Sequence, residues 1–402
     1  MCRPSEVLIH GPLASYASGF CSELTAQGYT PLSAANQVRV MAHVSRWLAA
    51  HRLGPDDLTP QRAKQFLIAR RREGYTGFLS ERGLAPLLGY LRRMGVVPAV
   101  CAPASTTALD RLLERYVDHL LRERGLACTT VRFRQKVARQ FLAEFGLIDE
   151  LDLGRLTAVD VRQFVLLKGR KQGIGQTKLI VTALRSLLRF LYLHGLTMTE
   201  LAAAAPAIAG SRYSSLPRGL EPALVERLLR SCDRRRAGGR RDYAVLLLLS
   251  RLGLRAGEVA AIELADIDWR RGELVIRGKG QHQERLPLPA DVGEALVAYL
   301  SRGRPRAGSR RLFLRSVAPK GGLAGGAIAE VVRQACVRAG LPEMGAHRLR
   351  HTLATQMLRR GSSLAEIAQV LRHRTLITTA IYARVDRDAL RTLAQPWPGG
   401  GA

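Results

Sequence analysis

The sequence predicts a mainly helical protein that carries one small antiparallel β-sheet. The first 200 residues space their apolar side chains in a heptad-like pattern with almost no β-branched alternation, which is typical of amphipathic helices. Residues 272–289, GELVIRGKGQHQERLPLP, instead alternate as two short strands around a Gly-Lys-Gly turn. These two observations predict a helical fold interrupted by a single hairpin.

The length and composition indicate a globular protein with more than one domain. Single hydrophobic cores stop growing near ~250 residues, and this chain has 402. Hydrophobic residues make up 47% and charged residues 24%, which excludes a disordered chain. The longest apolar run, near residues 244–249, is far short of the ~20 residues that cross a bilayer, and no signal peptide is evident. We expect no membrane association.

The charge and the cysteines narrow the class further. The formal net charge of +29 indicates a polyanionic partner, and arginine-biased codons alone do not account for so few acidic residues. The six cysteines include no C-x-x-C pair, so the sequence suggests neither a zinc ribbon nor a disulfide framework. They are expected to be small apolar residues in a reducing cytoplasm.

The chain shows an internal repeat followed by a linker. LTPQRAKQFLIARR, from Leu58, resembles LTAVDVRQFVLLKGR, from Leu156, and LLGYLRRMG, from Leu87, resembles LLRFLYLHG, from Leu187. Residues 202–222, which follow the second copy of the repeat, are rich in Ala, Gly, Pro and Ser and have little amphipathic pattern. The predicted domains are an N-terminal helical unit, its possible duplicate, a linker and a C-terminal domain, at residues 1–105, 106–205, 206–220 and 221–402.

The C-terminal domain contains helix signals and an unusual basic cluster. The segment SSLAEIAQVLRH places Glu366 three residues after Ser363, which is a capping-box pattern. Residues 346–358, AHRLRHTLATQML, place His347, Arg350 and His351 on one helix face with no carboxylate among them. That face is cationic or proton-donating throughout.

Four further residues join His347 and Arg350 in the candidate catalytic set. In chain order they are Arg255 in GLRAGE, Lys279 at the hairpin tip, His373 in LRH and Tyr382 nine residues later. Together with His347 and Arg350, this order and spacing resemble the tyrosine recombinase (phage integrase) family. That family has an Arg in G-L-R-x-x-E, a hairpin Lys, H-x-L-R-H, a second His in L-G-H and a nucleophilic Tyr.

The resemblance covers residues 211–390, and all six positions are filled. One departure is Arg372, where the family usually has Gly, which is expected to alter the bend between two helices. The resemblance implies a tyrosine recombinase catalytic domain preceded by a helical core-binding (SAM-like) domain, with residues 1–105 as an additional unit.

The resemblance also implies a role for each residue. Two arginines would hold the nonbridging phosphate oxygens, where a planar and permanently charged fork is the best ligand. Lys279 would protonate the departing 5′ oxygen, His347 would manage the phenol proton, and His373 would hydrogen-bond the phosphate. Tyr382 would form a 3′-phosphotyrosine that stores the bond energy for rejoining. We expect no metal and no cofactor.

Several of these residues, taken singly, also fit other roles. His347 and His351 could bind zinc, but the intervening residues are Arg, Leu and Arg, so His351 is expected to be a structural hydrogen-bonding residue. Asp266 and Asp268 could belong to a two-metal nuclease, but we assign them to the turn that enters the hairpin. Tyr382 lies about 100° around a helix from its apolar neighbour and need not be buried.

The sequence therefore predicts a site-specific recombinase or integrase, with a mobile element as its expected source. Its expected partner is double-stranded DNA, bound as a homotetramer on two sites, in the cytoplasm. Two alternatives stay open: a type IB topoisomerase and a noncatalytic architectural DNA-binding protein. The expected DNA contacts in the second helical unit are Arg132, Lys136 and Lys178.

Overall fold

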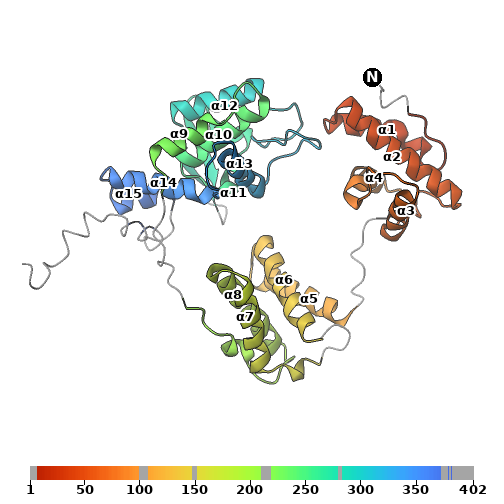
Figure 1. Ribbon diagram of the computed structural model, residues 1–402, viewed down its shortest axis with the longest axis horizontal. Helices are drawn as coiled ribbons and strands as arrows, with labels where there is room; N and C mark the ends of the chain where they lie inside the picture. The colour runs from red at the N-terminus through yellow and green to blue at the C-terminus, as the bar shows by residue number, and fades with distance from the viewer. Residues whose placement is uncertain are drawn as a thin grey trace, which may run out of the picture. The chain divides into compact units, whose positions relative to one another are not determined.

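The computed structural model describes residues 7–98, 107–146, 152–209, 219–278 and 283–372, together with Thr379 and Tyr382. The described chain is mostly helical and has one small sheet (Figure 1). By its contacts the chain divides into two compact units, residues 99–214 and residues 1–98 with 215–402. Three large apolar cores lie within residues 13–97, 109–205 and 220–349.

Four helices enclose the first core: α1 (Ala17–Ala26), α2 (Pro31–Ala50), α3 (Pro60–Arg72) and α4 (Glu81–Arg93), after the short 3-10 helix η2 (Ala14–Tyr16). Helices α2 and α3 begin in the same way. The hydroxyl of Thr30 or Thr59 accepts a hydrogen bond from the third backbone N–H, and a proline occupies the first helical position. These caps satisfy N–H groups that have no partner within the helix.

The second core has a parallel construction: α5 (Ala108–Asp118), α6 (Cys128–Glu144), α7 (Ala158–Lys171) and α8 (Ile174–Leu193), with the π-helical turn η3 (His119–Glu123) and the 3-10 helices η4 (Leu153–Arg155) and η5 (Leu201–Ala204). The Thr157 hydroxyl caps α7, and the Asp160 carboxylate accepts a hydrogen bond from the Thr157 backbone N–H. This capping box fixes where α7 begins.

Aromatic contacts support the predicted duplication. SRWLAAH, from Ser45, resembles ARQFLAEF, from Ala138, after a short gap, so Trp47 aligns with Phe141, and Phe66 aligns with Phe164 in the repeat given above. The rings of Trp47 and Phe66 pack edge to face at 6.0 Å, and those of Phe141 and Phe164 do so at 5.2 Å. The first and last helices of each unit are also joined by an aromatic pair, Phe20–Tyr90 at 5.3 Å and Tyr116–Phe190 at 5.1 Å. Each unit thus ties corresponding helices together with large apolar side chains.

The third core is built around one buried helix. Its helices are α9 (Pro222–Arg230), α10 (Ala237–Arg251), α11 (Ala256–Ala261), α12 (Ala290–Arg302), α13 (Gly325–Arg338) and α14 (Ala346–Arg359). A further helix, α15 (Leu364–Val370), packs on the later part of α14 in a smaller apolar cluster. Every residue of the run 244–249 in α10 is buried, and α10 contacts α12, α13 and α14. An apolar surface on all sides is what a central helix requires. The predicted capping box of Ser363 and Glu366 begins α15.

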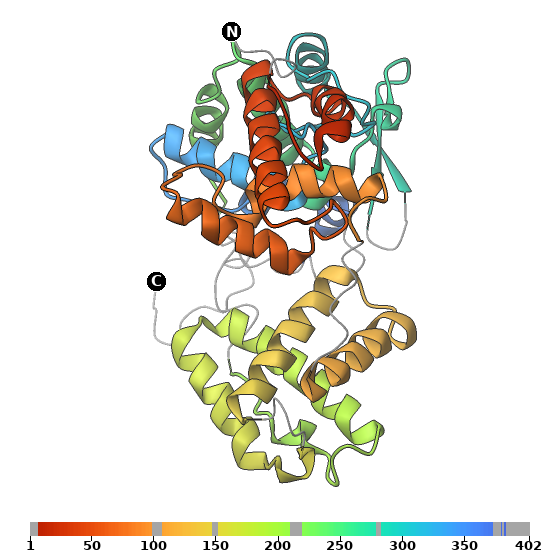
Figure 2. The same cartoon turned by 90° about the vertical axis from the view of Figure 1, so that its right-hand side faces the viewer.

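The sheet comprises β1 (Ile267–Asp268), β2 (Glu273–Arg277) and β3 (Gln283–Pro287), antiparallel in that order, after the 3-10 helix η6 (Leu264–Asp266). The neighbouring strands β2 and β3 run side by side in Figure 2. The predicted hairpin and fold class are confirmed, whereas β1 was not predicted. Asp266 pairs with Arg277, and Asp268 accepts from the backbone N–H groups of the next turn, so both aspartates serve the hairpin as expected.

The predicted linker, residues 206–220, lies largely outside the described residues, since 210–218 are not among them. The domain boundaries therefore stay a prediction. Within the described part of the chain, no helix combines the length and the apolar character that a membrane span requires.

Candidate active site

Arg350 lies at the centre of the predicted site. It projects from α14 and is only 1% exposed. Its guanidinium donates to the backbone carbonyls of Gly253, at 2.5 Å from Nη1, and of Leu371. Nε is buried and has no hydrogen-bond partner among the described residues. Burial and the charges of Arg255 and Arg372 lower the pKa of Arg350 to about 10, which still leaves it protonated at neutral pH.

Gly253 makes this arrangement possible. Its φ of +58° lies in the left-handed region, which a side chain disfavours. A Cβ at this position would lie 2.8 Å from Leu371 Cδ2 and 3.0 Å from Leu353 Cδ2. Gly253, the first glycine of the GLRAGE segment, is therefore needed for both its backbone conformation and its small size.

Arg255 is the N-cap residue of α11, and Glu258 holds it in place. Glu258 Oε2 accepts from the Arg255 backbone N–H at 2.9 Å, and Oε1 accepts from Arg255 Nη1 at 2.6 Å. The Glu258 side chain is 7% exposed, while that of Arg255 is 45% exposed. One face of the guanidinium thus remains available to an anion.

Tyr382 is buried, a point that the sequence left open. It is 1% exposed and packs with Ala354, Ile367 and Leu371. Its hydroxyl lies 2.7 Å from Nδ1 of His351. Burial raises the pKa of Tyr382 to about 12, although the charge of Arg350 acts in the opposite direction. The phenol is therefore protonated at neutral pH.

His351, the partner of this phenol, packs against a second histidine of α14. The rings of His347 and His351 pack edge to face with centroids 4.4 Å apart. Burial, His347 and Arg350 lower the pKa of His351 to about 4, and burial, Arg350 and Arg255 lower the pKa of His347. Both imidazoles are therefore neutral near pH 7, and a neutral ring can accept a proton.

Four of the six predicted site residues are brought together. Arg350 and His347 lie one turn apart on α14, and Arg350 donates to the carbonyls of Gly253, two residues before Arg255, and of Leu371, which packs with Tyr382. The charge of Arg255 also lowers the pKa of Arg350 and of His347. Lys279 and His373 lie outside the described residues. The described chain nearest to Lys279 in sequence belongs to the strands β2 and β3, and the described residue next to His373 is Arg372.

Two features of the site were not predicted. His351 was expected to form a structural hydrogen bond, but its partner is the proposed nucleophile Tyr382. Arg372, noted in the sequence only as a departure from Gly, pairs with Glu258 at 3.1 Å. The i, i+4 spacing of His347 and His351 was the available signal for the first feature. No local sequence pattern signals the second, because its partners lie 114 positions apart.

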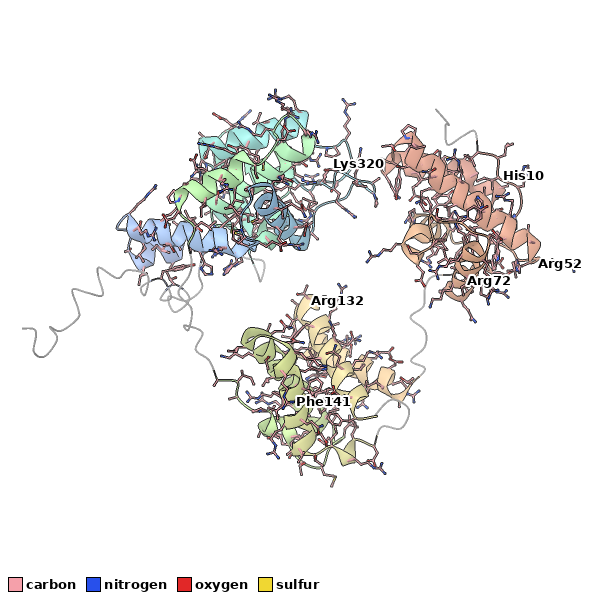
Figure 3. The ribbon with its side chains drawn as sticks, in the orientation of Figure 1. His10, Arg52, Arg72, Arg132, Phe141 and Lys320 are labelled. Carbon is pink, nitrogen blue, oxygen red and sulfur yellow. The ribbon has the colours of Figure 1, made fainter. Side chains whose placement is uncertain are left out.

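The expected DNA contacts lie in the second helical unit. Arg132 and Lys136 are exposed and one turn apart on α6, and Arg132 is labelled in Figure 3. Lys178 is partly buried on α8. Their role in binding stays a prediction.

One group in the described part of the chain has the composition of a metal site. Ligand atoms of His119, Glu123 and His194 lie within 4.8 Å of one another. Glu123 already pairs with His119 at 2.7 Å, and Glu123 is 62% exposed. An i, i+4 ion pair accounts for two of the three residues, and the group belongs to the second core rather than to the core that carries Arg350.

Comparison with known proteins places these residues in context. A family model, described as the phage integrase family, matches residues 218–388. The chain is 42% identical over 404 residues to "Putative integrase/recombinase y4rA" of Sinorhizobium fredii (strain NBRC 101917 / NGR234), covering 99% of this chain and 97% of the relative. It is 32% identical over 313 residues to the tyrosine recombinase XerD of Mycobacterium tuberculosis (strain ATCC 25618 / H37Rv), covering 71% and 96%.

The fold is shared with a solved structure. The crystal structure of the site-specific recombinase XerH, bound to palindromic difH substrate in a post-cleavage complex, matches with a TM-score of 0.57 at 19% identity, covering 83% of this chain and 94% of that one.

Proposed function

The chain belongs to the phage integrase family of tyrosine recombinases, and we propose that it cleaves and rejoins DNA strands through a covalent bond between Tyr382 and a 3′ phosphate. The observation that carries this proposal is the pair of backbone contacts of Arg350. Its guanidinium donates to the carbonyl of Gly253, two residues before Arg255, and to the carbonyl of Leu371, whose side chain packs with Tyr382. A phenol beside two guanidinium groups suits an attack on a phosphodiester, whose charge rests on the nonbridging oxygens.

In the proposed reaction, Arg255 and Arg350 hold the two nonbridging oxygens of the scissile phosphate. Backbone carbonyls hold Arg350 and Glu258 holds Arg255, so the orientation of both guanidinium groups is fixed before charge develops. The partnerless Nε of Arg350 is a donor that an anion could satisfy. Anion binding also offsets the repulsion between the two neighbouring cations.

The nucleophile requires loss of a proton. Tyr382 Oη attacks phosphorus as it loses its proton to the histidine pair of α14. His351 Nδ1 lies 2.7 Å from the hydroxyl and orients it, and we assign the final proton acceptor to His347, whose ring packs against that of His351. The bond to the 5′ oxygen breaks, and Lys279 donates a proton to that oxygen. The products are a free 5′ hydroxyl and a 3′-phosphotyrosine, which a second 5′ hydroxyl resolves by the reverse steps. His373 is proposed as a further hydrogen-bond donor to the phosphate.

The proposed partner is duplex DNA, bound by a homotetramer on two sites in the cytoplasm. The net charge of +29 supports a polyanionic partner, and XerH is described as bound to a DNA substrate. We assign the chain to a mobile element on the basis of its basic composition and its additional N-terminal helical unit.

The decisive experiment traps the covalent intermediate. Full-length protein is incubated with a pool of nicked duplexes of randomised sequence, in which cleavage releases a short fragment that diffuses away, and products are separated on denaturing gels. We expect a protein–DNA adduct with wild type and none with Tyr382→Phe, which lacks the attacking oxygen. Both proteins should bind the pool equally. Tight binding by wild type with no adduct on any duplex would contradict the proposal and favour an architectural role.

A second assay separates recombination from relaxation. A type IB topoisomerase would form the same adduct but relax one supercoiled plasmid as a monomer. The proposed recombinase instead exchanges strands between two copies of the duplex recovered from the adduct. Relaxation without exchange would contradict the recombinase assignment while leaving the nucleophile in place.

A further inference from the structure

Arg372 has an unusual backbone conformation for its residue type. It follows the last turn of α15 with a φ of +54°, in the left-handed region that glycine adopts readily and side chains disfavour. A substitution for glycine at such a position costs stability unless the side chain makes compensating contacts. The contacts of Arg372 therefore need an explanation.

The side chain of Arg372 is directed into the predicted active site. It is 6% exposed, and Nη2 lies 3.1 Å from Glu258 Oε2, on a carboxylate that is itself 7% exposed. A weaker contact joins Nε to Glu284 Oε2 on β3 at 3.8 Å, and Nη1 donates to the carbonyl of Val370 at 3.2 Å. The buried partner, Glu258, is the carboxylate that also binds Arg255.

The turn after α15 thus holds both site arginines. The carbonyl of Leu371 accepts from Arg350, and the next residue, Arg372, pairs with the carboxylate that orients Arg255. Glu258 alone would neutralise Arg255 as a simple ion pair. Because two guanidinium groups share this one carboxylate, a net positive charge remains beside the place where a phosphate would bind.

We propose that Arg372 is a positioning residue that acts through Glu258, fixing the guanidinium of Arg255 and leaving its charge available to the scissile phosphate. This inference rests on the proposed function and deepens it. It assigns an active-site task to a side chain at a position where the related pattern has none.

The test compares substitutions that preserve the backbone conformation. Arg372→Gly suits a positive φ and removes the cation, Arg372→Asn tolerates it, and Arg372→Lys retains the charge. Arg52→Gly is the matched control, because Arg52 also follows a helix with a φ of +54° but is exposed (Figure 3).

The first readout is the single-turnover rate of adduct formation on the nicked duplex, measured with the equilibrium affinity for the same duplex. We expect Arg372→Gly and Arg372→Asn to slow the adduct by about 10- to 100-fold, since small misplacements of a catalytic group cost this much. Affinity should change by less than about threefold if only transition-state binding is lost. Arg372→Lys should restore part of the rate, and Arg52→Gly should equal wild type. Wild-type rates in both Arg372→Gly and Arg372→Asn would overturn the inference.

The second readout does not need activity. Urea midpoints are measured for Arg372→Gly, Glu258→Gln and the double variant, with hydrogen exchange of the buried α10 amides reporting the transition. If the two side chains are coupled, the urea midpoint of the double variant should be close to that of the less stable single variant. It should not fall by the sum of the two single decreases. Additive decreases in the urea midpoint would overturn the inference, whether or not wild type forms an adduct. Absence of an adduct with wild type would count against the proposed function instead.

Discussion

At the scale of single residues, the contact between His351 and Tyr382 makes a stability prediction. His351→Phe leaves the buried phenol of Tyr382 without its 2.7 Å partner, which should lower the free energy of unfolding by about 1–3 kcal/mol. Hydrogen exchange of the α14 amides measures this loss. The control is the double variant His351→Phe with Tyr382→Phe, which removes both polar partners and should recover part of the loss. A double variant with no recovery would argue against a direct bond.

The same histidine predicts a pH dependence. Its pKa is about 4 in the folded protein, against 6.5 for the free side chain. Between these values the unfolded chain binds a proton that the native chain does not bind, so stability is complete above about pH 6.5 and falls as the pH falls towards 4. His347 contributes in the same direction. Urea midpoints between about pH 7.5 and about pH 4.5 should therefore fall less in His351→Phe than in wild type; parallel curves would contradict the assignment.

At the scale of elements, the repeated threonine caps predict matched local effects. Thr59→Ala and Thr157→Ala each remove an N-cap hydroxyl, at the starts of α3 and α7, and each should cost about 1 kcal/mol. Thr157 also anchors a capping box, so the larger effect is expected there. Hydrogen exchange in the first turns of the two helices measures both. A loss spread evenly over all the helices would show that the caps do not act locally.

Elements were predictable where local patterns determine them. Helix α15 begins at the predicted capping box, and the alternation of residues 272–289 formed β2 and β3. The site was predictable only as a set of residue types in order, through the family resemblance. The burial of Tyr382 and the pairing of Arg372 with Glu258 were not, because both depend on packing between segments far apart in the chain. Hydrophobic periodicity reports which face of a helix is apolar, not which distant residue covers it.

At the scale of the whole molecule, the net charge of +29 predicts a steep salt dependence of DNA binding. If about 6–10 phosphates are contacted, affinity should fall by about 10³–10⁵ between roughly 50 and 200 mM salt. Fluorescence anisotropy on a labelled duplex measures the slope of log affinity against log salt. Arg132→Ala and Lys136→Ala should each reduce that slope by about one. The control is Arg230→Ala, which should change the slope less because Arg230 is paired with Glu226. Equal slopes in all three variants would show that α6 does not contact the DNA.

The way in which Arg350 is held has a consequence for how the sequence around it can vary among homologues. Both of its acceptors are main-chain oxygens, at residues 253 and 371, and every amino acid brings such an oxygen. Exchanging the apolar side chain at 371 would leave its acceptor in place, whereas position 253 is restricted to the smallest residue by the leucines that pack on it. Homologous chains could therefore carry other apolar side chains at position 371 and still hold this guanidinium through the same main-chain oxygen.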